Sequence, residues 1–283
     1  MSTLLVTGAS GLIGNRLIQQ LSTKHTVIAM SRRKPQGDDF TYVRGDFSQS
    51  EDLVQLDAYA IDGVVHLAAV TGGCIEREGM LINVEGTRVL LQYLAARGCK
   101  KMVLASSIAT VGFQHTDYVP EQLPIADEDG CQDRDGYGLS KYLMEEITRY
   151  LSRQKPELDL LNIRLSSAGV NEEVRAGLKE RGPWCMGAPT YMVVDDAVDL
   201  FALAIEAPLK PGLRIVNGAC KKWWSSVSTA EQLRHWYGEH IDVSFYERPE
   251  NKYASAFATT RLEAELGFEA TRTLDILARI QQK

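Results

Sequence analysis

The sequence predicts an α/β fold with a doubly wound parallel sheet and a small C-terminal α/β lobe. Short apolar runs alternate with amphipathic helical segments, a glycine-rich turn follows the first run, and the alternation stops after residue 165. The 283 residues suit one large α/β unit with a small appendage. Hydrophobic residues make up 45% of the chain and charged residues 24%, which excludes a disordered protein.

The predicted elements follow in a regular order. Short apolar runs bounded by turn residues predict strands at 4–7, 27–30, 41–43, 63–67, 101–107 and 158–165. Apolar residues at helical spacing predict intervening helices over 11–24, 83–96 and 137–151. Glycine and proline interrupt the next segment, 166–190, which we expect to be irregular. The rest predicts a helix, a strand and two further helices, over 195–205, 213–217, 228–238 and 259–266.

The turn after the first strand reads TGASGLIG, from Thr7 to Gly14. Gly8 permits a tight turn, Gly11 lets the backbone approach a pyrophosphate, and Gly14 lets the helix pack closely on the strand. The free N–H groups of the following helix then face the anion. The turn therefore predicts a Rossmann-type dinucleotide site, formed by Gly8, Ser10, Gly11, Leu12, Ile13 and Gly14.

This site sets the expected domain organisation. Residues 1–165 would form the dinucleotide-binding Rossmann core, and the helix at 191–206 would pack back onto it. Residues 166–190 and 207–283 would form the small substrate-binding lobe. We find no internal repeat or low-complexity linker in the sequence.

A second pattern carries acid–base chemistry. Tyr137 and Lys141 stand four residues apart on a predicted helix, so their side chains share a face. A phenol has a reference pKa of about 10, and a nearby ammonium favours the phenolate. Ser106 and Ser107 end a predicted strand, where the carboxyl ends of parallel strands face a ligand crevice. These residue types suit the interconversion of an alcohol and a ketone.

Further motifs lie between about residue 3 and residue 270, namely HLAA at 66–69, GDF at 45–47, NVEGT at 83–87, SSIATVG at 106–112, VDD at 194–196 and AELGF at 264–268. With the glycine turn and YGLSK at 137–141, they resemble the extended short-chain dehydrogenase/reductase family, in its NAD-dependent epimerase/dehydratase group. The resemblance implies a Rossmann fold and a nicotinamide cofactor.

The resemblance also implies residue roles. Tyr137 would be the general acid/base, Lys141 would lower its pKa and hold the nicotinamide ribose, and Ser107, rather than its neighbour Ser106, would be the catalytic serine. Asn83 would support a proton relay or the local structure. The remaining implied contacts are to adenine by Asp46 and Phe47, to the cofactor ribose by Leu67, Ala68 and Ala69, and to substrate by Val70, Thr71, Ser107 and Ser167.

The end of the second strand predicts the choice of cofactor. NAD-binding units place an Asp or Glu there to accept hydrogen bonds from the ribose 2′-hydroxyl. Here the strand runs into Ser31, Arg32 and Arg33, and the next carboxylate is Asp38. Guanidinium groups match phosphate oxygens, and the Ser31 hydroxyl would add a donor. We therefore expect NADP(H), with NAD(H) or a solvated basic turn as the alternatives.

Three functions fit these residues. The first is an NADP(H)-dependent oxidoreductase that interconverts a hydroxyl and a keto group on a small polar, sugar-like substrate. The second is a nucleotide-sugar epimerase or dehydratase that retains its cofactor, and the third is a non-catalytic dinucleotide sensor. Ser167 stands where nucleotide-sugar members carry Asn, and acidic residues dominate 113–136. These departures favour the first function.

The net charge of −6 argues against a nucleic-acid partner. Five cysteines without C-x-x-C spacing fit a reduced cytoplasmic protein and no metal site. We expect neither a secretion signal nor a membrane span. A homodimer is expected through the helices at 83–96 and 137–151, whose apolar residues would form a seam or belong to the core: Leu90, Leu91, Leu94, Tyr142, Leu143 and Ile147.

Overall fold

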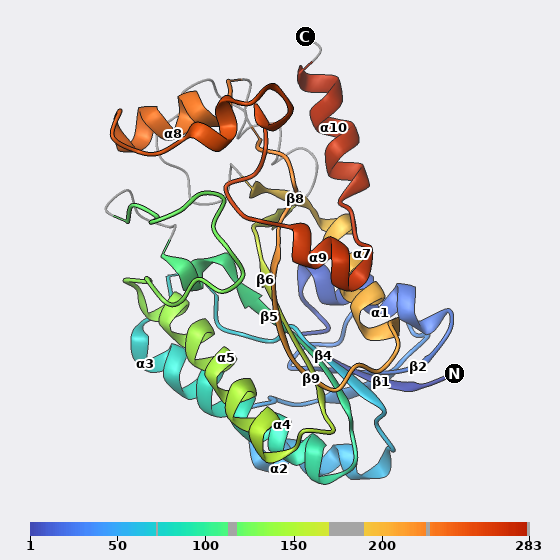
Figure 1. Cartoon of the computed structure of the whole chain (residues 1–283). Coiled ribbons are helices and arrows are strands. Elements are labelled where there is room, and N and C mark those ends of the chain that lie inside the picture. The colour runs from blue at the N-terminus through green and yellow to red at the C-terminus, as the bar shows by residue number, and fades with distance from the viewer. Residues whose placement is uncertain (72, 113–117, 170–189, 225–226, 282–283) are drawn as a thin grey trace. The chain divides into compact units, whose positions relative to one another are not determined.

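The computed structural model describes residues 1–71, 73–112, 118–169, 190–224 and 227–281 (Figure 1). Most of the segment predicted to be irregular, 166–190, therefore lies outside the described residues, including its basic residues Arg175, Lys179 and Arg181.

Seven strands form one sheet: β1 (Thr3–Thr7), β2 (Thr26–Ser31), β3 (Thr41–Arg44), β4 (Gly63–His66), β5 (Lys101–Ser107), β6 (Asp159–Leu165) and β9 (Gly212–Gly218). Their order is β3-β2-β1-β4-β5-β6-β9, and the registered pairs β1–β2, β2–β3, β1–β4 and β4–β5 are all parallel. From β1 the sheet extends through β2 and β3 to one edge. The chain then returns to the other side of β1, where β4 and the later strands extend the sheet to the opposite edge. The predicted doubly wound parallel fold is confirmed.

The chain divides into two compact units. Unit 1 comprises Met1–Ser106, Arg134–Ile163 and Val198–Ile215, and unit 2 comprises Ser107–Asp133, Arg164–Ala197 and Val216–Lys283. The division differs from the predicted one mainly in three places: Ser107–Asp133 and residues 191–197 lie in unit 2 instead of the Rossmann core, and residues 207–215 lie in unit 1 instead of the small lobe.

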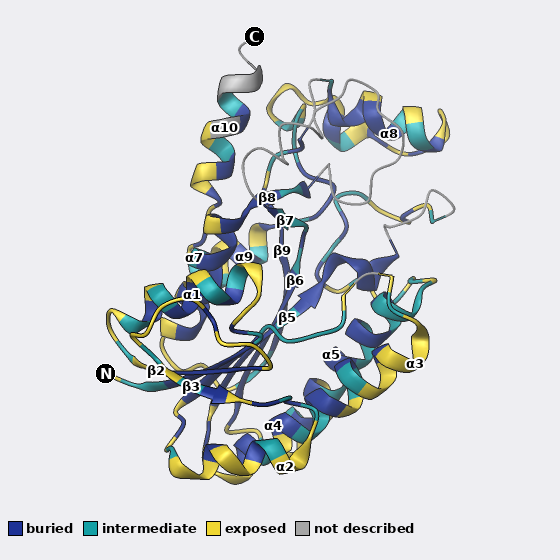
Figure 2. Ribbon diagram, turned by 180° about the vertical axis from the view of Figure 1, so that it is seen from behind, coloured by how far each residue is buried: buried dark blue, intermediate teal, exposed yellow. Residues whose placement is uncertain are grey.

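The core of unit 1 lies between the sheet and the helices α4 (Thr87–Ala96) and α5 (Gly136–Gln154). Leu90, Leu91 and Leu94 of α4 are fully or almost fully buried in it. Each buried leucine contributes roughly 1.5–3 kcal/mol. Of the two alternatives for these three residues, a dimer seam or the core, the structure therefore supports the core. Figure 2 shows the buried inner faces and exposed outer faces of α4 and α5.

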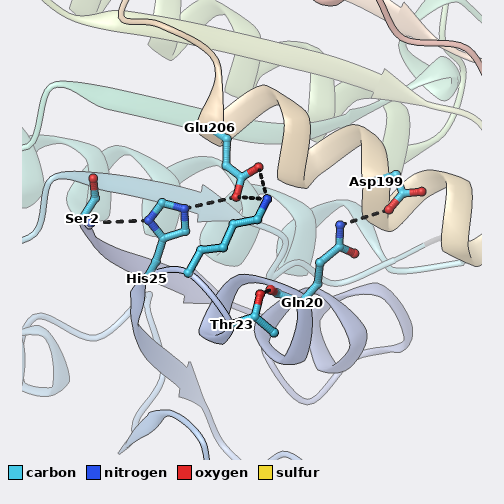
Figure 3. A network of polar contacts seen from close by, with 7 residues as sticks. Ser2, Gln20, Thr23, His25, Asp199 and Glu206 are labelled. Atoms are coloured by element: carbon cyan, nitrogen blue, oxygen red, sulfur yellow. Dashed lines mark hydrogen bonds and ion pairs between the residues drawn. The ribbon is translucent and has the colours of Figure 1, made fainter.

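On the other face of the sheet in unit 1, α1 (Leu12–Ser22) lies beside the part of α7 (Val194–Glu206) that belongs to this unit (Figure 1). Gln20 donates to Asp199 at 3.0 Å, and Lys24 and His25 both contact the Glu206 carboxylate (Figure 3). These polar contacts fix the position of α7 along α1 in addition to the apolar packing.

A π-helix over Gly79–Gly86 precedes α4, after a single turn α3 (Glu76–Glu78). The sequence predicted one α-helix from residue 83. The glycines at both ends permit close packing: a Cβ at Gly79 would lie 2.9 Å from the Gly136 carbonyl oxygen, and one at Gly86 would lie 2.7 Å from the Ser48 Cβ. A short helix α2 (Ser50–Leu53) and a 3₁₀ turn over Val54–Ala58 were also not predicted.

Unit 2 contains the two-stranded parallel pair β7 (Ala168–Gly169) and β8 (Met192–Val193), with α8 (Thr229–Tyr237), α9 (Thr260–Leu266) and α10 (Thr271–Gln281). Its core includes Trp223, which is 1% exposed and packs on Trp236 at a centroid distance of 5.8 Å. The aromatic pair is therefore part of the packing of this unit. Asp196 accepts hydrogen bonds from the backbone and side chain of Thr273 at 2.7 and 2.6 Å.

Candidate active site

The glycine turn shapes the start of α1. Gly8 has φ +68°, and its carbonyl oxygen accepts the Gly11 N–H at 2.9 Å. Gly11 is the N-cap residue of α1 and offers no side chain to cap the helix, while Ser10 and Leu12 are exposed and Ile13 is half-buried. The first N–H groups of α1 are therefore directed toward the outside of this turn, as an anion requires.

Two glycines leave no room for a side chain. A Cβ at Gly8 would lie 2.7 Å from the backbone nitrogen of Ala68, and a Cβ at Gly14 would lie 2.3 Å from the Gly8 carbonyl oxygen. The turn thus lies against the chain that follows β4, and α1 lies against the turn. This close backbone packing fits a dinucleotide pyrophosphate at the uncapped helix start.

The end of β2 presents two exposed guanidiniums. Arg32 and Arg33 have no carboxylate partner among the described residues. The Ser31 hydroxyl donates to the Arg33 carbonyl oxygen at 2.7 Å, which helps to form the turn, and its expected role as a phosphate donor stays a prediction. Arg44, which the sequence analysis did not select, ends β3 opposite Ser31 and is also exposed.

The expected adenine and ribose contacts lie near the ends of β3 and β4. Asp46 is half-buried, and its Oδ1 accepts two hydrogen bonds from Ser48. Phe47 is 7% exposed and packs edge-on against His66 at a centroid distance of 4.8 Å. The Phe47 ring is therefore largely core. Three further residues, Leu67, Ala68 and Ala69, follow β4 and are half-buried.

His66 links three elements of unit 1 below this site. One ring nitrogen contacts the Thr7 hydroxyl at 2.7 Å and the other contacts the Thr87 hydroxyl at 2.9 Å. The side chain is 2% exposed. Burial, with a smaller effect of the Lys141 charge, lowers the pKa of His66 to about 3. The imidazole is therefore neutral at physiological pH and joins β1 and β4 to the start of α4.

This burial predicts a pH-dependent stability. In the unfolded chain His66 takes up a proton below its ordinary pKa of about 6.5, whereas the folded protein does so only near 3. The unfolding free energy should therefore fall as the pH drops through this window, by up to about 1.4 kcal/mol per pH unit from this residue. Urea unfolding from pH 7 to 4 should show a shallower fall for His66→Gln than for the wild type. Parallel curves would contradict a neutral His66.

Asn83 clamps the segment that follows β4. Its side chain accepts the Val70 N–H at 2.8 Å, donates to the Val70 carbonyl oxygen at 2.9 Å and donates to the Ser140 hydroxyl at 2.9 Å. Asn83 is 1% exposed, and both its amide hydrogens are used in these contacts. Of its two expected roles, the geometry supports the structural one. Thr71, one residue beyond Val70, is exposed.

Tyr137 and Lys141 lie in the first turns of α5. Asp135 caps this helix by accepting the backbone N–H groups of Tyr137 and Gly138 at 2.8 and 2.9 Å. The Lys141 ammonium donates to the Ala105 carbonyl oxygen of β5 at 2.7 Å and lies 5.9 Å from the Tyr137 ring centroid. Burial lowers the pKa of Lys141 to about 8, and the Glu145 charge opposes this change. The structure thus brings the predicted pair together.

The two serines at the end of β5 differ in their hydrogen bonds. Ser106 is buried, and its hydroxyl donates to the Glu145 carboxylate at 2.5 Å. The Ser107 hydroxyl accepts the Ala109 N–H at 3.1 Å, which leaves its own proton available to a ligand. Within unit 2, Ser107 caps a 3₁₀ turn over Ile108–Val111 that ends at Gly112, where φ is +81°.

On the substrate side, unit 2 shows Ser167 half-buried, with its carbonyl oxygen accepting the Met192 N–H at 2.9 Å. Arg164 donates to the carbonyl oxygens of Asp127 and Asp129 at 3.2 and 2.9 Å. Asp127 is 7% exposed and accepts the Asn217 N–H at 2.5 Å. Asp127 is therefore a buried structural carboxylate within the acidic segment 113–136.

Within the described ranges, no group of three or more His, Cys, Asp or Glu residues could hold a metal ion. In the same part of the chain, no helix has the length and apolar composition that crossing a bilayer requires.

A model of the NAD-dependent epimerase/dehydratase family matches residues 4–169, more than half of the chain. The chain belongs to this family. The predicted resemblance to the NAD-dependent epimerase/dehydratase group is thereby confirmed.

Several proteins similar in sequence to this chain are named as epimerases. A UDP-glucose 4-epimerase from Pisum sativum is 28% identical over 202 residues, which cover 63% of this chain and 56% of that protein. The chain thus spans a little over half the length of this curated relative.

Solved structures show the same fold. A short-chain dehydrogenase/reductase superfamily protein from Agrobacterium tumefaciens with bound NAD has a TM-score of 0.73 at 21% identity, covering 99% of this chain and 95% of that one. A UDP-glucose 4-epimerase from Bifidobacterium longum in complex with NAD+ and UDP has a TM-score of 0.71 at 21% identity, covering 95% and 93%.

Proposed function

We propose that this family member oxidises and re-reduces one secondary alcohol of a nucleotide sugar, with a nicotinamide cofactor that stays bound. The observation that supports this proposal most strongly is the position of the buried Lys141 ammonium. It donates a hydrogen bond to the Ala105 carbonyl oxygen and lies beside the Tyr137 ring. The epimerase names of the sequence relatives support a retained cofactor and a nucleotide sugar over the small sugar-like substrate favoured by the sequence. A dehydratase is the variant of this function with a further elimination step.

The glycine turn would hold the cofactor pyrophosphate, because Gly8 and Gly14 let the turn and the start of α1 pack with backbone against backbone, and Gly11 adds no side chain at the helix start. When bound, the nicotinamide accepts hydride from the substrate carbon and returns it. Tyr137 would take the hydroxyl proton during oxidation and give it back during reduction. The Ser107 hydroxyl, whose proton is not used within its turn, would donate to the same substrate oxygen. Lys141 would stabilise the Tyr137 phenolate.

The remaining assignments stay predictions. Asp46, Leu67, Ala68 and Ala69 would surround the adenosine and ribose parts of the cofactor. Val70, Thr71 and Ser167 would face the substrate, and residues 166–190 and 207–283 would supply its binding lobe. A homodimer and a cytoplasmic location also stay predictions.

A second candidate is a net oxidoreductase that releases NADP(H). The exposed pair Arg32 and Arg33 supports the NADP(H) part of this candidate, because a 2′-phosphate needs cationic partners and no carboxylate occupies this turn among the described residues. Preference for NADP(H) is compatible with either function. Turnover of a nucleotide sugar without a net change in nicotinamide absorbance would support the first candidate. A change in nicotinamide absorbance that is stoichiometric with product would support the second.

The cofactor preference gives a direct binding test. We expect NADPH to bind more tightly than NADH, and Arg32→Ala/Arg33→Ala to lose at least tenfold in NADPH affinity, because a charge-assisted hydrogen bond contributes roughly 1.5–3 kcal/mol. NADH affinity should change little. Isothermal titration measures both. Lys34→Ala is the matched control, since the Lys34 ammonium already pairs with Asp38 at 2.6 Å. Equal losses for both cofactors would contradict a 2′-phosphate contact.

A further inference from the structure

A buried carboxylate lies one helical turn beyond Lys141. Glu145 on α5 is 1% exposed and accepts the Ser106 hydroxyl at 2.5 Å. Burying a carboxylate is unfavourable unless hydrogen bonds and an opposite charge compensate. Glu145 is therefore stabilised at this position by its partners.

Glu145 is the middle member of a polar row on the buried face of α5. Lys141 donates to Ala105 of β5, Ser106 of β5 donates to Glu145, and Asn162 of β6 donates to the Thr148 hydroxyl at 2.6 Å. Apolar packing alone is non-directional, whereas these three contacts specify how far α5 lies along the strands. The position of Tyr137, in the first turn of the same helix, depends on that register.

Glu145 also faces the Lys141 charge. Among the residues that the structure describes, the titratable groups that interact with this ammonium are Glu145 and Tyr137 on α5, His66 on β4 and Cys74 beyond β4. His66 is neutral at physiological pH, and burial raises the pKa of Cys74 above its ordinary value, so its thiol is neutral too. Glu145 is thus the carboxylate in this set, at a distance in sequence that places it on the same helix face as Lys141.

We propose that Glu145 is a positioning residue, which keeps the Lys141 side chain charged and fixes the end of β5 through Ser106. By accepting the Ser106 proton it also leaves Ser107 as the serine that donates to a ligand. The kinetic consequences rest on the proposed function, but the electrostatic claim about Lys141 does not.

The test separates the charge from the hydrogen bond. Glu145→Gln keeps the size and an acceptor for Ser106 but removes the charge, Glu145→Asp keeps the charge on a shorter side chain, and Ser106→Ala removes only the hydrogen bond. NMR of lysine-labelled protein, with the Lys141 signal assigned from Lys141→Arg, measures the pKa of Lys141 directly. We expect Glu145→Gln to lower it by about one unit, a tenfold loss of proton affinity. Glu145→Asp and Ser106→Ala should change it by less than half as much.

The kinetic measurement distinguishes positioning from a structural effect. The alkaline limb of the kcat profile should move to lower pH in Glu145→Gln, so that activity lost above neutral pH returns on acidification. A structural role would lower kcat equally at all pH values. An unchanged Lys141 pKa in folded Glu145→Gln would overturn the proposal. Absence of wild-type turnover would instead overturn the proposed function, while the NMR result would still decide the role of Glu145.

Discussion

Tyr137→Phe should lower kcat by about 10²–10⁴-fold while leaving the fold and cofactor affinity intact. The substitution removes only the phenolic hydroxyl, which is the proposed proton donor and acceptor. The helix start is unaffected, because Asp135 caps α5 through backbone N–H groups. Steady-state kinetics, with cofactor affinity measured alongside, give the comparison.

The matched control for this prediction is Tyr142→Phe. Tyr142 lies on the same helix, one residue beyond Lys141, and is also half-buried. It should keep kcat close to the wild-type value. If Tyr137→Phe also did so, the assignment of the acid/base would be wrong, whatever the reaction proves to be.

Gly14→Ala should disrupt the cofactor site through backbone packing. The added Cβ would lie 2.3 Å from the Gly8 carbonyl oxygen and 2.9 Å from the Ala9 Cα, both backbone atoms, so α1 must move away from the turn. Overpacking of this kind typically costs about 1–3 kcal/mol of stability. We expect that loss in urea unfolding, together with at least a tenfold loss in cofactor affinity, because the displaced helix no longer presents its N–H groups correctly.

Gly11→Ala controls for the methyl group itself. Its Cβ would meet only the Gly8 carbonyl oxygen, at 3.1 Å, and the residue is exposed. Its stability should therefore stay within about 0.5 kcal/mol of the wild type, as for other surface substitutions. Equal destabilisation by the two variants would show that the close contact at Gly14 does not set the position of α1.

The fold was predictable because its signals are local. TGASGLIG, the apolar strands and the Tyr137–Lys141 spacing each specify a structure within a few residues. The π-helix was not predictable in this way. The sequence from Gly79 to Gly86 does not distinguish a π-helix from an α-helix. Only the packing of the segment against Ser48 and Gly136 shows why glycines stand at its two ends.

Residues that act through distant partners were also missed. Glu145 has the spacing of an ordinary helix surface residue, and nothing near it in sequence indicates that Ser106 of β5 lies within hydrogen-bond distance. Arg44 is placed beside Ser31 only by the parallel register of β2 and β3. His66 stands in the HLAA motif, and nothing near it in sequence indicates that its two threonine partners lie on β1 and at the start of α4.

The retention of hydride tests the central claim most directly. A nucleotide sugar carrying deuterium at its ring carbons is incubated with the protein and unlabelled cofactor, and product and cofactor are analysed by mass spectrometry. The proposed function predicts a stereoisomer, or a dehydrated product, that retains the deuterium removed during oxidation, with no free deuterated NADPH or NADH. Stoichiometric deuterium in the released cofactor, together with a keto product, would contradict the claim of a retained cofactor and establish a net oxidoreductase.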